Sequence, residues 1–132
     1  MSLALALLLV ILAGCTQPQA AIAISASPKK YSPFMSSVQG ITFTIEEPLG
    51  DEDIEYDWTA SDGSFLRPNN VNVTEFTGDK VLWVSLRMPD PDDYNGEIIT
   101  IHVDARNEKS GKIVAEASIR IIEEDVFYIV EE

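Results

Sequence analysis

The sequence predicts an all-β protein built as an antiparallel β-sandwich of about seven strands. Apolar and polar residues alternate at 41–46, 54–60 and 97–106, as they do in strands with one buried face. Turn signals such as Asp62-Gly63 separate these segments, because glycine accepts the positive φ that tight turns require. The sequence between them shows no helical periodicity. Many short strands joined by turns are typical of two antiparallel sheets packed around one core.

The first strand is expected at 20–27, where Ile22 and Ile24 fall on one face. Prolines at both ends of the segment that follows, 28–33, end this strand and predict a loop. The chain between the Asp-Gly turn and the next long strand is less regular. Only a short strand, at 71–73, is predicted there.

Four longer strands are regular enough to assign a core face. In 54–60 the inward set contains Trp58, which we expect to anchor the core. In 80–87 the aliphatic residues are assigned to the core, which places Trp83 on the outer face. The expected inward residues of this strand are Leu82, Val84 and Leu86. Those of the last two long strands are Ile99, Ile101, Val103 and Ala105, and then Ile113, Ala115, Ala117, Ile119 and Ile121.

The C-terminal segment 126–132 is apolar and ends in two glutamates. We expect it to add an edge strand or to fold against the sandwich. The alternative is an exposed strand offered to a partner by β-augmentation.

The N-terminus carries an apolar run from Leu3 to Ala13, which ends in Leu12-Ala13-Gly14-Cys15. The run is too short for a bilayer, which takes about 20 residues, and it fits a secretory signal peptide over 1–14. Leu12-Ala13-Gly14-Cys15 resembles the lipobox of bacterial lipoproteins. That resemblance implies cleavage before Cys15 and a lipid on its sulfur. No Lys or Arg occurs before Lys29, whereas signal peptides normally begin with basic residues.

A lipid on Cys15 would attach the protein to the extracytoplasmic side of the cell membrane or the outer membrane. Cys15 is the only cysteine, so no internal disulfide is expected. The resulting layout is a signal peptide at 1–14, a short tether at 15–19, the sandwich at 20–125 and the tail at 126–132. Membrane lipid is therefore the first expected partner.

The net charge is −13, from 22 acidic and nine basic residues. Nucleic-acid binding requires a basic patch, so this class of function is disfavoured. Electrostatic docking to anionic lipid is disfavoured for the same reason, which leaves the acyl chains as the membrane contact.

Three segments from residue 56 onward resemble polycystic-kidney-disease-type and related bacterial immunoglobulin-like (Ig-like) domains. Segment 56–64 is similar to the family's aromatic–Trp strand and Asp-Gly turn, 81–89 to its next apolar strand, and 95–104 to its strand ending in Val-x-Asp. The resemblance implies an Ig-like sandwich. Domains of this kind commonly serve as spacers, adhesion modules or carbohydrate-associated modules.

The sequence offers little catalytic chemistry. The only histidine, His102, falls on the outward parity of its strand, where a lone histidine is ordinary. We therefore expect a protein that is not an enzyme and that carries no cofactor beyond the lipid. A calcium site is a minor alternative to two solvated acidic turns, since neither turn follows the order of a calcium loop. Its ligands would come from Asp51, Asp53, Asp90, Asp92 and Asp93.

These observations favour a non-catalytic module that binds or assembles with another envelope protein. The alternatives are a structural spacer without a specific ligand and a glycan- or calcium-binding module. The candidate contact residues are Trp83, Tyr94, Phe127 and Tyr128. If Trp83, Tyr94 and Tyr128 share an exposed face, a binding role is favoured, whereas their burial favours the spacer.

Overall fold

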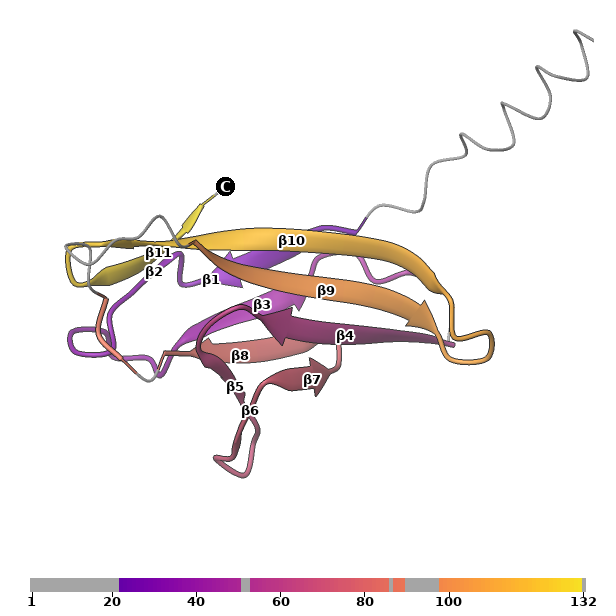
Figure 1. Ribbon diagram of the computed structural model, residues 1–132, viewed down its shortest axis with the longest axis horizontal. Helices are drawn as coiled ribbons and strands as arrows, with labels where there is room; N and C mark the ends of the chain where they lie inside the picture. Colours follow the sequence, from indigo (N-terminus) through magenta and orange to yellow (C-terminus); the bar gives the residue numbers. More distant parts are fainter. Residues whose placement is uncertain (1–21, 51–52, 86, 90–97, 132) are drawn as a thin grey trace, which may run out of the picture.

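The computed structural model describes residues 22–50, 53–85, 87–89 and 98–131. The described chain forms two antiparallel sheets packed face to face (Figure 1). The predicted signal peptide and the predicted tether, which includes Cys15, lie outside the described residues, as does Leu86. No described segment forms a helix with the length and hydropathy needed to cross a bilayer.

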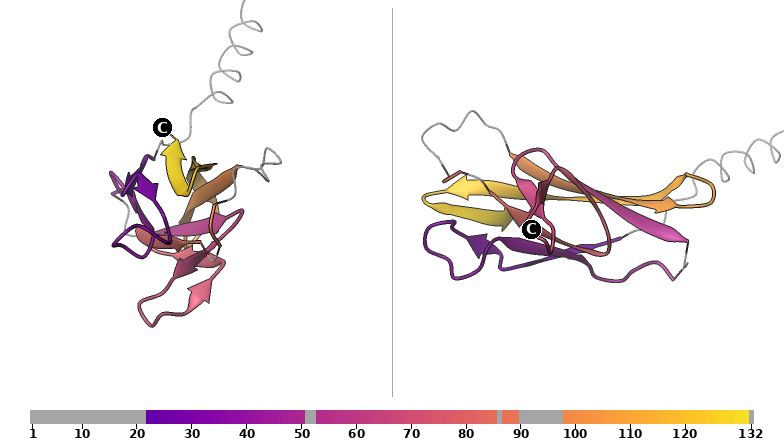
Figure 2. Two further views of the ribbon diagram at one scale, coloured as in Figure 1. Left: turned by 90° about the vertical axis from the view of Figure 1, so that its left-hand side faces the viewer. Right: turned by 90° about the horizontal axis from the view of Figure 1, so that it is seen from below.

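Each sheet combines segments from distant parts of the chain. The first contains, in spatial order, β1 (Ile24–Ser27), β3 (Ile41–Ile45), β8 (Lys80–Val84), β5 (Ser64–Leu66) and β6 (Asn72–Val73). The second contains β2 (Lys30–Tyr31), β11 (Phe127–Glu131), β10 (Ile113–Glu124), β9 (Ile99–Asn107), β4 (Ile54–Ala60) and β7 (Glu75–Thr77). Seen from below in Figure 2, β1 and β3 follow one layer, and β10 and β11 follow the other.

The strand order confirms an Ig-like sandwich. β1, β3, β8 and β5 occupy the places of strands A, B, E and D, and β4, β9 and β10 those of C, F and G. Six of these seven strands were predicted from the sequence. β5 was not, and the short strand predicted at 71–73 is β6. Four further segments, β2, β6, β7 and β11, extend the two sheets within the described ranges.

The core lies between the sheets and contains most of the residues expected there. Tyr56 and Trp58 of β4 are buried, and the four predicted residues of β9 are at most 5% exposed. Ile113 of β10 is an exception at 42% exposed, because the pairing of β10 with β9 shifts between Ile113 and Ala115. This bulge interrupts the alternation that assigned Ile113 to the core.

The predicted face of β8 is wrong for Leu82 and Trp83, although Val84 is buried as predicted. Val81 and Trp83 point into the core at 2% and 0% exposed, whereas Leu82 is only half-buried. Four consecutive apolar residues, 81–84, give no alternation from which to choose a face. The choice follows from pairing with β3, which sets Trp83 beside Ile41 and leaves Leu82 beside the outward Thr42.

The C-terminal segment packs into the sandwich and is not an exposed strand. β11 pairs with β10 along five residues, and with β2 on its other side, so it is not an edge strand either. Asp125 has a φ of 58° in the turn between β10 and β11, a conformation that Asp tolerates better than most residues. The predicted boundary at residue 125 therefore divides residues that belong to one sheet.

The two ends of the sandwich carry different connections. β1 begins at the end where the β3–β4 and β9–β10 loops lie, so the described chain starts near that end (Figure 1). The β2–β3 loop and the β10–β11 turn lie at the opposite end, which we call the far end.

Candidate functional site

The β2–β3 loop presents apolar side chains at the far end. Phe34 is 83% exposed, Met35 is 66% exposed and Val38 is 48% exposed. Three of the six large exposed apolar residues in the described ranges thus belong to one loop. Exposed apolar residues gathered in one place commonly mark an interaction surface.

Hydrogen bonds within the loop hold Phe34 and Met35 outward. Ser32 is fully buried, and its Oγ accepts from the backbone N–H groups of both residues, each at 3.3 Å. The Ser36 N–H donates to the Ser32 carbonyl at 3.0 Å, and Ser36 Oγ accepts from the Ser32 N–H at 2.9 Å. The loop is therefore a closed turn with two apolar side chains on its outside.

The base of the loop is attached to the core through Tyr31. Its hydroxyl donates to the Gln39 carbonyl at 2.7 Å, which joins the two ends of the loop. Its ring stacks against Tyr128 of β11, with centroids 6.4 Å apart. Burial raises the pKa of Tyr31, so its hydroxyl keeps the proton it donates.

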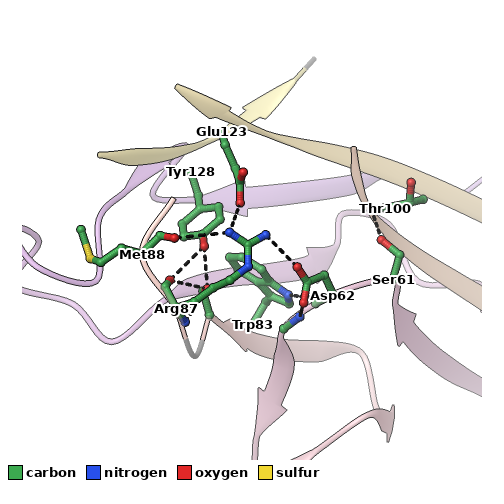
Figure 3. Close-up of polar contacts among 10 residues, drawn as sticks. Ser61, Asp62, Trp83, Arg87, Met88, Thr100, Glu123 and Tyr128 are labelled. Atoms are coloured by element: carbon green, nitrogen blue, oxygen red, sulfur yellow. Dashed lines mark hydrogen bonds and ion pairs between the residues drawn. The ribbon is translucent and has the colours of Figure 1, made fainter. Parts of the chain in front are cut away.

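A second polar cluster fixes the rest of the far end around Arg87 (Figure 3). The Arg87 guanidinium lies between two carboxylates, 2.8 Å from Asp62 and 2.5 Å from Glu123. Burial works against ionisation of Asp62, but hydrogen bonds from Arg87 and the Gly63 N–H outweigh it and lower the pKa of Asp62. These contacts join the β4–β5 turn, the chain after β8 and the end of β10.

Trp83 and Tyr128 support this cluster from the core. Trp83 Nε1 donates to the Asp62 carbonyl at 2.9 Å, and the Trp83 and Tyr128 rings meet edge to face at 5.2 Å. The Tyr128 hydroxyl donates to the Arg87 carbonyl at 2.9 Å and lies 2.7 Å from Ser85 Oγ. Both rings are 0% exposed, so the prediction that they form a contact surface is wrong.

The other two predicted contact residues stand apart. Phe127 is half-buried, and its ring lies 4.2 Å beneath the ammonium of Lys30 in β2. Tyr94 lies outside the described residues. Phe34 and Met35 were not among the contact residues predicted from the sequence. Two adjacent large apolar residues inside a loop bounded by Pro33 and serines were the signal that could have revealed them.

Of the predicted calcium ligands, only Asp53 lies within the described residues. Its carboxylate is 3.0 Å from Lys109 Nζ, so it is paired with a cation on the β9–β10 loop. The remaining four predicted ligands, Asp51, Asp90, Asp92 and Asp93, lie outside the described residues.

The outer face of the second sheet carries a groove of about 710 Å³ between β4, β7 and β9. Its lining is polar and charged, and includes Asp57, Glu75, Asp104 and Arg106. Arg106 Nε pairs with Asp57 at 3.1 Å across the strands.

Beside this groove, His102 of β9 is surrounded by polar side chains. His102 Nε2 is 2.9 Å from an oxygen of Asp104 and 3.8 Å from an oxygen of Glu116, and His102 Nδ1 is 2.6 Å from Ser118 Oγ. The strand register produces this arrangement, because it pairs Ser118 with His102 and Glu116 with Asp104. His102 thus lies in the histidine–carboxylate cluster, formed by His102, Asp104 and Glu116.

No protein-family model, curated protein or solved structure matches this chain.

Proposed function

We propose that this protein is a lipid-anchored extracytoplasmic lipoprotein whose Ig-like domain binds another envelope protein through its β2–β3 loop. The apolar leader and Leu12-Ala13-Gly14-Cys15 support the anchor. The observation that carries the binding role is the outward placement of Phe34 and Met35 at the far end, opposite the end where β1 begins.

The loop has two properties that favour binding. Burying an exposed Phe side chain contributes about 1.5–3 kcal/mol, so Phe34 and Met35 can anchor a small interface. The Ser32 and Tyr31 hydrogen bonds hold the loop before a partner arrives, which lowers the entropy lost on binding. The partner surface that fits these side chains is a shallow apolar pocket.

A spacer without a specific ligand is the second candidate. It is favoured by the burial of Trp83 and Tyr128, which removes two of the side chains expected to serve a partner. The two candidates differ in the role of the β2–β3 loop, which a spacer does not need.

The proposal is non-catalytic, although Ser118 and Asp104 contact the two ring nitrogens of His102. A serine nucleophile also requires donors aimed at the oxyanion of the reacting carbonyl. Ser118 lies in the middle of β10, where backbone N–H groups lie in the plane of the sheet while its Oγ projects from the face. The strand geometry does not direct those donors toward an atom bound by Ser118.

Photocrosslinking in intact cells tests the binding role. A benzophenone amino acid replaces Phe34 or Val38 in two separate variants of the full-length protein. A control probe replaces Val71, which is 48% exposed like Val38 but lies before β6. One dominant crosslinked protein at positions 34 and 38, absent at position 71, is expected. Equal patterns at the loop and control positions would leave the spacer as the better account.

The anchor is tested separately. Cys15→Ser should move the protein from the membrane fraction to the soluble fraction and abolish metabolic labelling with a palmitate analogue. Retention of both the label and membrane association in the variant would refute acylation at Cys15.

A further inference from the structure

We propose that the histidine–carboxylate cluster of His102, Asp104 and Glu116 is a binding site for a divalent transition-metal ion of the Zn²⁺ type. The inference is independent of the anchor and of the β2–β3 loop. It concerns the outer face of the second sheet, not the far end.

The ligand atoms already converge. One nitrogen and two carboxylate oxygens lie within 4.8 Å of one another. Tetrahedral Zn²⁺ with bonds of about 2.0–2.1 Å separates its ligand atoms by roughly 3.3 Å. The His102–Asp104 distance of 2.9 Å and the His102–Glu116 distance of 3.8 Å lie on either side of that value. Both distances from His102 are therefore already close to the spacing that one ion requires, and the third pair lies within 4.8 Å.

The three ligands lie on two paired strands. His102 and Asp104 are two residues apart on β9, so their side chains leave the same face. Glu116 comes from β10, which pairs with β9 along most of its length. Sites built on strands hold their geometry better than sites built on loops.

Ser118 supplies the outer contact that metal-binding histidines usually have. Its Oγ lies 2.6 Å from His102 Nδ1. With the proton on Nδ1, the ring donates to Ser118 Oγ and the lone pair of Nε2 is directed to the ion. Without an ion, the other tautomer can donate from Nε2 to Asp104 while Ser118 donates to Nδ1. Metal binding by neutral His102 thus exchanges one tautomer for the other.

The charges favour a dication. Within the described ranges, neither Asp104 nor Glu116 forms an ion pair with a lysine or arginine, and the nearby Arg106 pairs with Asp57. Two carboxylates therefore lie beside one imidazole, and a dication balances their charge. Imidazole as a ligand selects for Zn²⁺, Ni²⁺ or Cu²⁺ over Ca²⁺ and Mg²⁺, which prefer oxygen. Three protein ligands leave one tetrahedral position for water or a partner's side chain.

Zn²⁺ titration of the full-length protein in detergent, followed by calorimetry and NMR, tests this inference. His102 is the only histidine, so its ring resonances report on the site without ambiguity. We expect one Zn²⁺ per chain that shifts these resonances, and a fall in affinity of at least tenfold in Ser118→Ala. His102→Ala should lose this binding event while keeping its circular dichroism spectrum. Cys15 is common to all variants, so a thiol contribution cancels in the comparison.

Glu116→Gln removes one ligand charge and should weaken binding, whereas Glu46→Gln, a matched exposed carboxylate outside the cluster, should not. Two results would overturn the inference. One is unchanged Zn²⁺ affinity in His102→Ala. The other is displacement of Zn²⁺ from the wild-type protein by a tenfold excess of Mg²⁺, which would show attraction to acidic surface charge alone.

Discussion

Replacement of Trp83 tests which face of β8 lies in the core. The structure buries Trp83, whereas the sequence prediction placed it on the outer face. The Trp83 side chain is 0% exposed. A buried aromatic residue of this kind removes about 150–250 Å² from water, which at about 25 cal/mol per Å² corresponds to roughly 4–6 kcal/mol. This area estimate is an upper bound, because the unfolded chain already buries part of its apolar surface. Truncations of buried aromatic residues typically cost about 3–5 kcal/mol, and we expect Trp83→Ala to lower the free energy of unfolding by about that amount.

Trp83→Phe provides a milder variant in case the alanine variant does not fold. It keeps most of the ring but loses the hydrogen bond from Nε1 to the Asp62 carbonyl at 2.9 Å. One net hydrogen bond contributes about 0.5–1.5 kcal/mol, and the smaller ring adds a partial cavity, so we expect a loss of about 1–3 kcal/mol.

Urea unfolding followed by far-ultraviolet circular dichroism measures both variants. Val71→Ala, at a position 48% exposed, is the control and should change the free energy of unfolding by no more than about 0.5 kcal/mol. If Trp83→Ala behaves like this control, Trp83 lies on the outer face and our description of β8 is incorrect.

Three further perturbations test the far end and its supports. Gly63→Ala should destabilise the fold by more than Gly111→Ala. Both glycines have a positive φ, but of the two only Gly63 would place its added Cβ against the Trp83 indole, 2.6 Å from the ring; the difference between the urea midpoints of the two variants measures that clash. Asp62→Asn should destabilise at neutral pH, because the Arg87 contact lowers the folded-state pKa of Asp62. That stabilisation is fully present above the unfolded-state pKa of about 3.9 and is lost as the pH falls through the lower folded-state pKa. The stabilities of Asp62→Asn and wild type should therefore approach each other as the pH falls below about 4, and a difference independent of pH would contradict the ion pair. Deletion from residue 127 onward should abolish cooperative thermal unfolding because it removes two core residues, and a truncated chain that melts like the full-length protein would show that β11 is dispensable.

The core face of β9 could be predicted from the alternation of polar and apolar residues, whereas that of β8 could not. In β9 the polar residues Thr100, His102 and Asp104 alternate with aliphatic ones, so only one face can be buried. In β8 both faces are apolar, and Lys80 was the one polar marker of the outward parity. The choice then depends on which residues of β3 lie opposite, which is a property of tertiary pairing.

The candidate sites show the same division between local and non-local information. His102 and Asp104 are two residues apart, so their shared face could be predicted from the sequence. The approach of Glu116 could not, because it depends on the register between β9 and β10 and on the bulge near Ile113. The outward placement of Phe34 depends on the buried hydroxyl of Ser32, which no alternation pattern reveals.

The position of β11 between β2 and β10 has a consequence for how the chain acquires its structure. Tyr31 at the base of the β2–β3 loop pairs directly with Tyr128, nearly the whole described chain away. Pairings between such distant residues are slow to form, because a long loop must close before the contact contributes any stability. A nascent chain that still lacks β11 offers no strand for β2 to pair with, and the ring of Tyr31 cannot stack against Tyr128. The β2–β3 loop therefore adopts the conformation described above only after β11 has been synthesised. Incomplete chains do not hold Phe34 and Met35 in this arrangement.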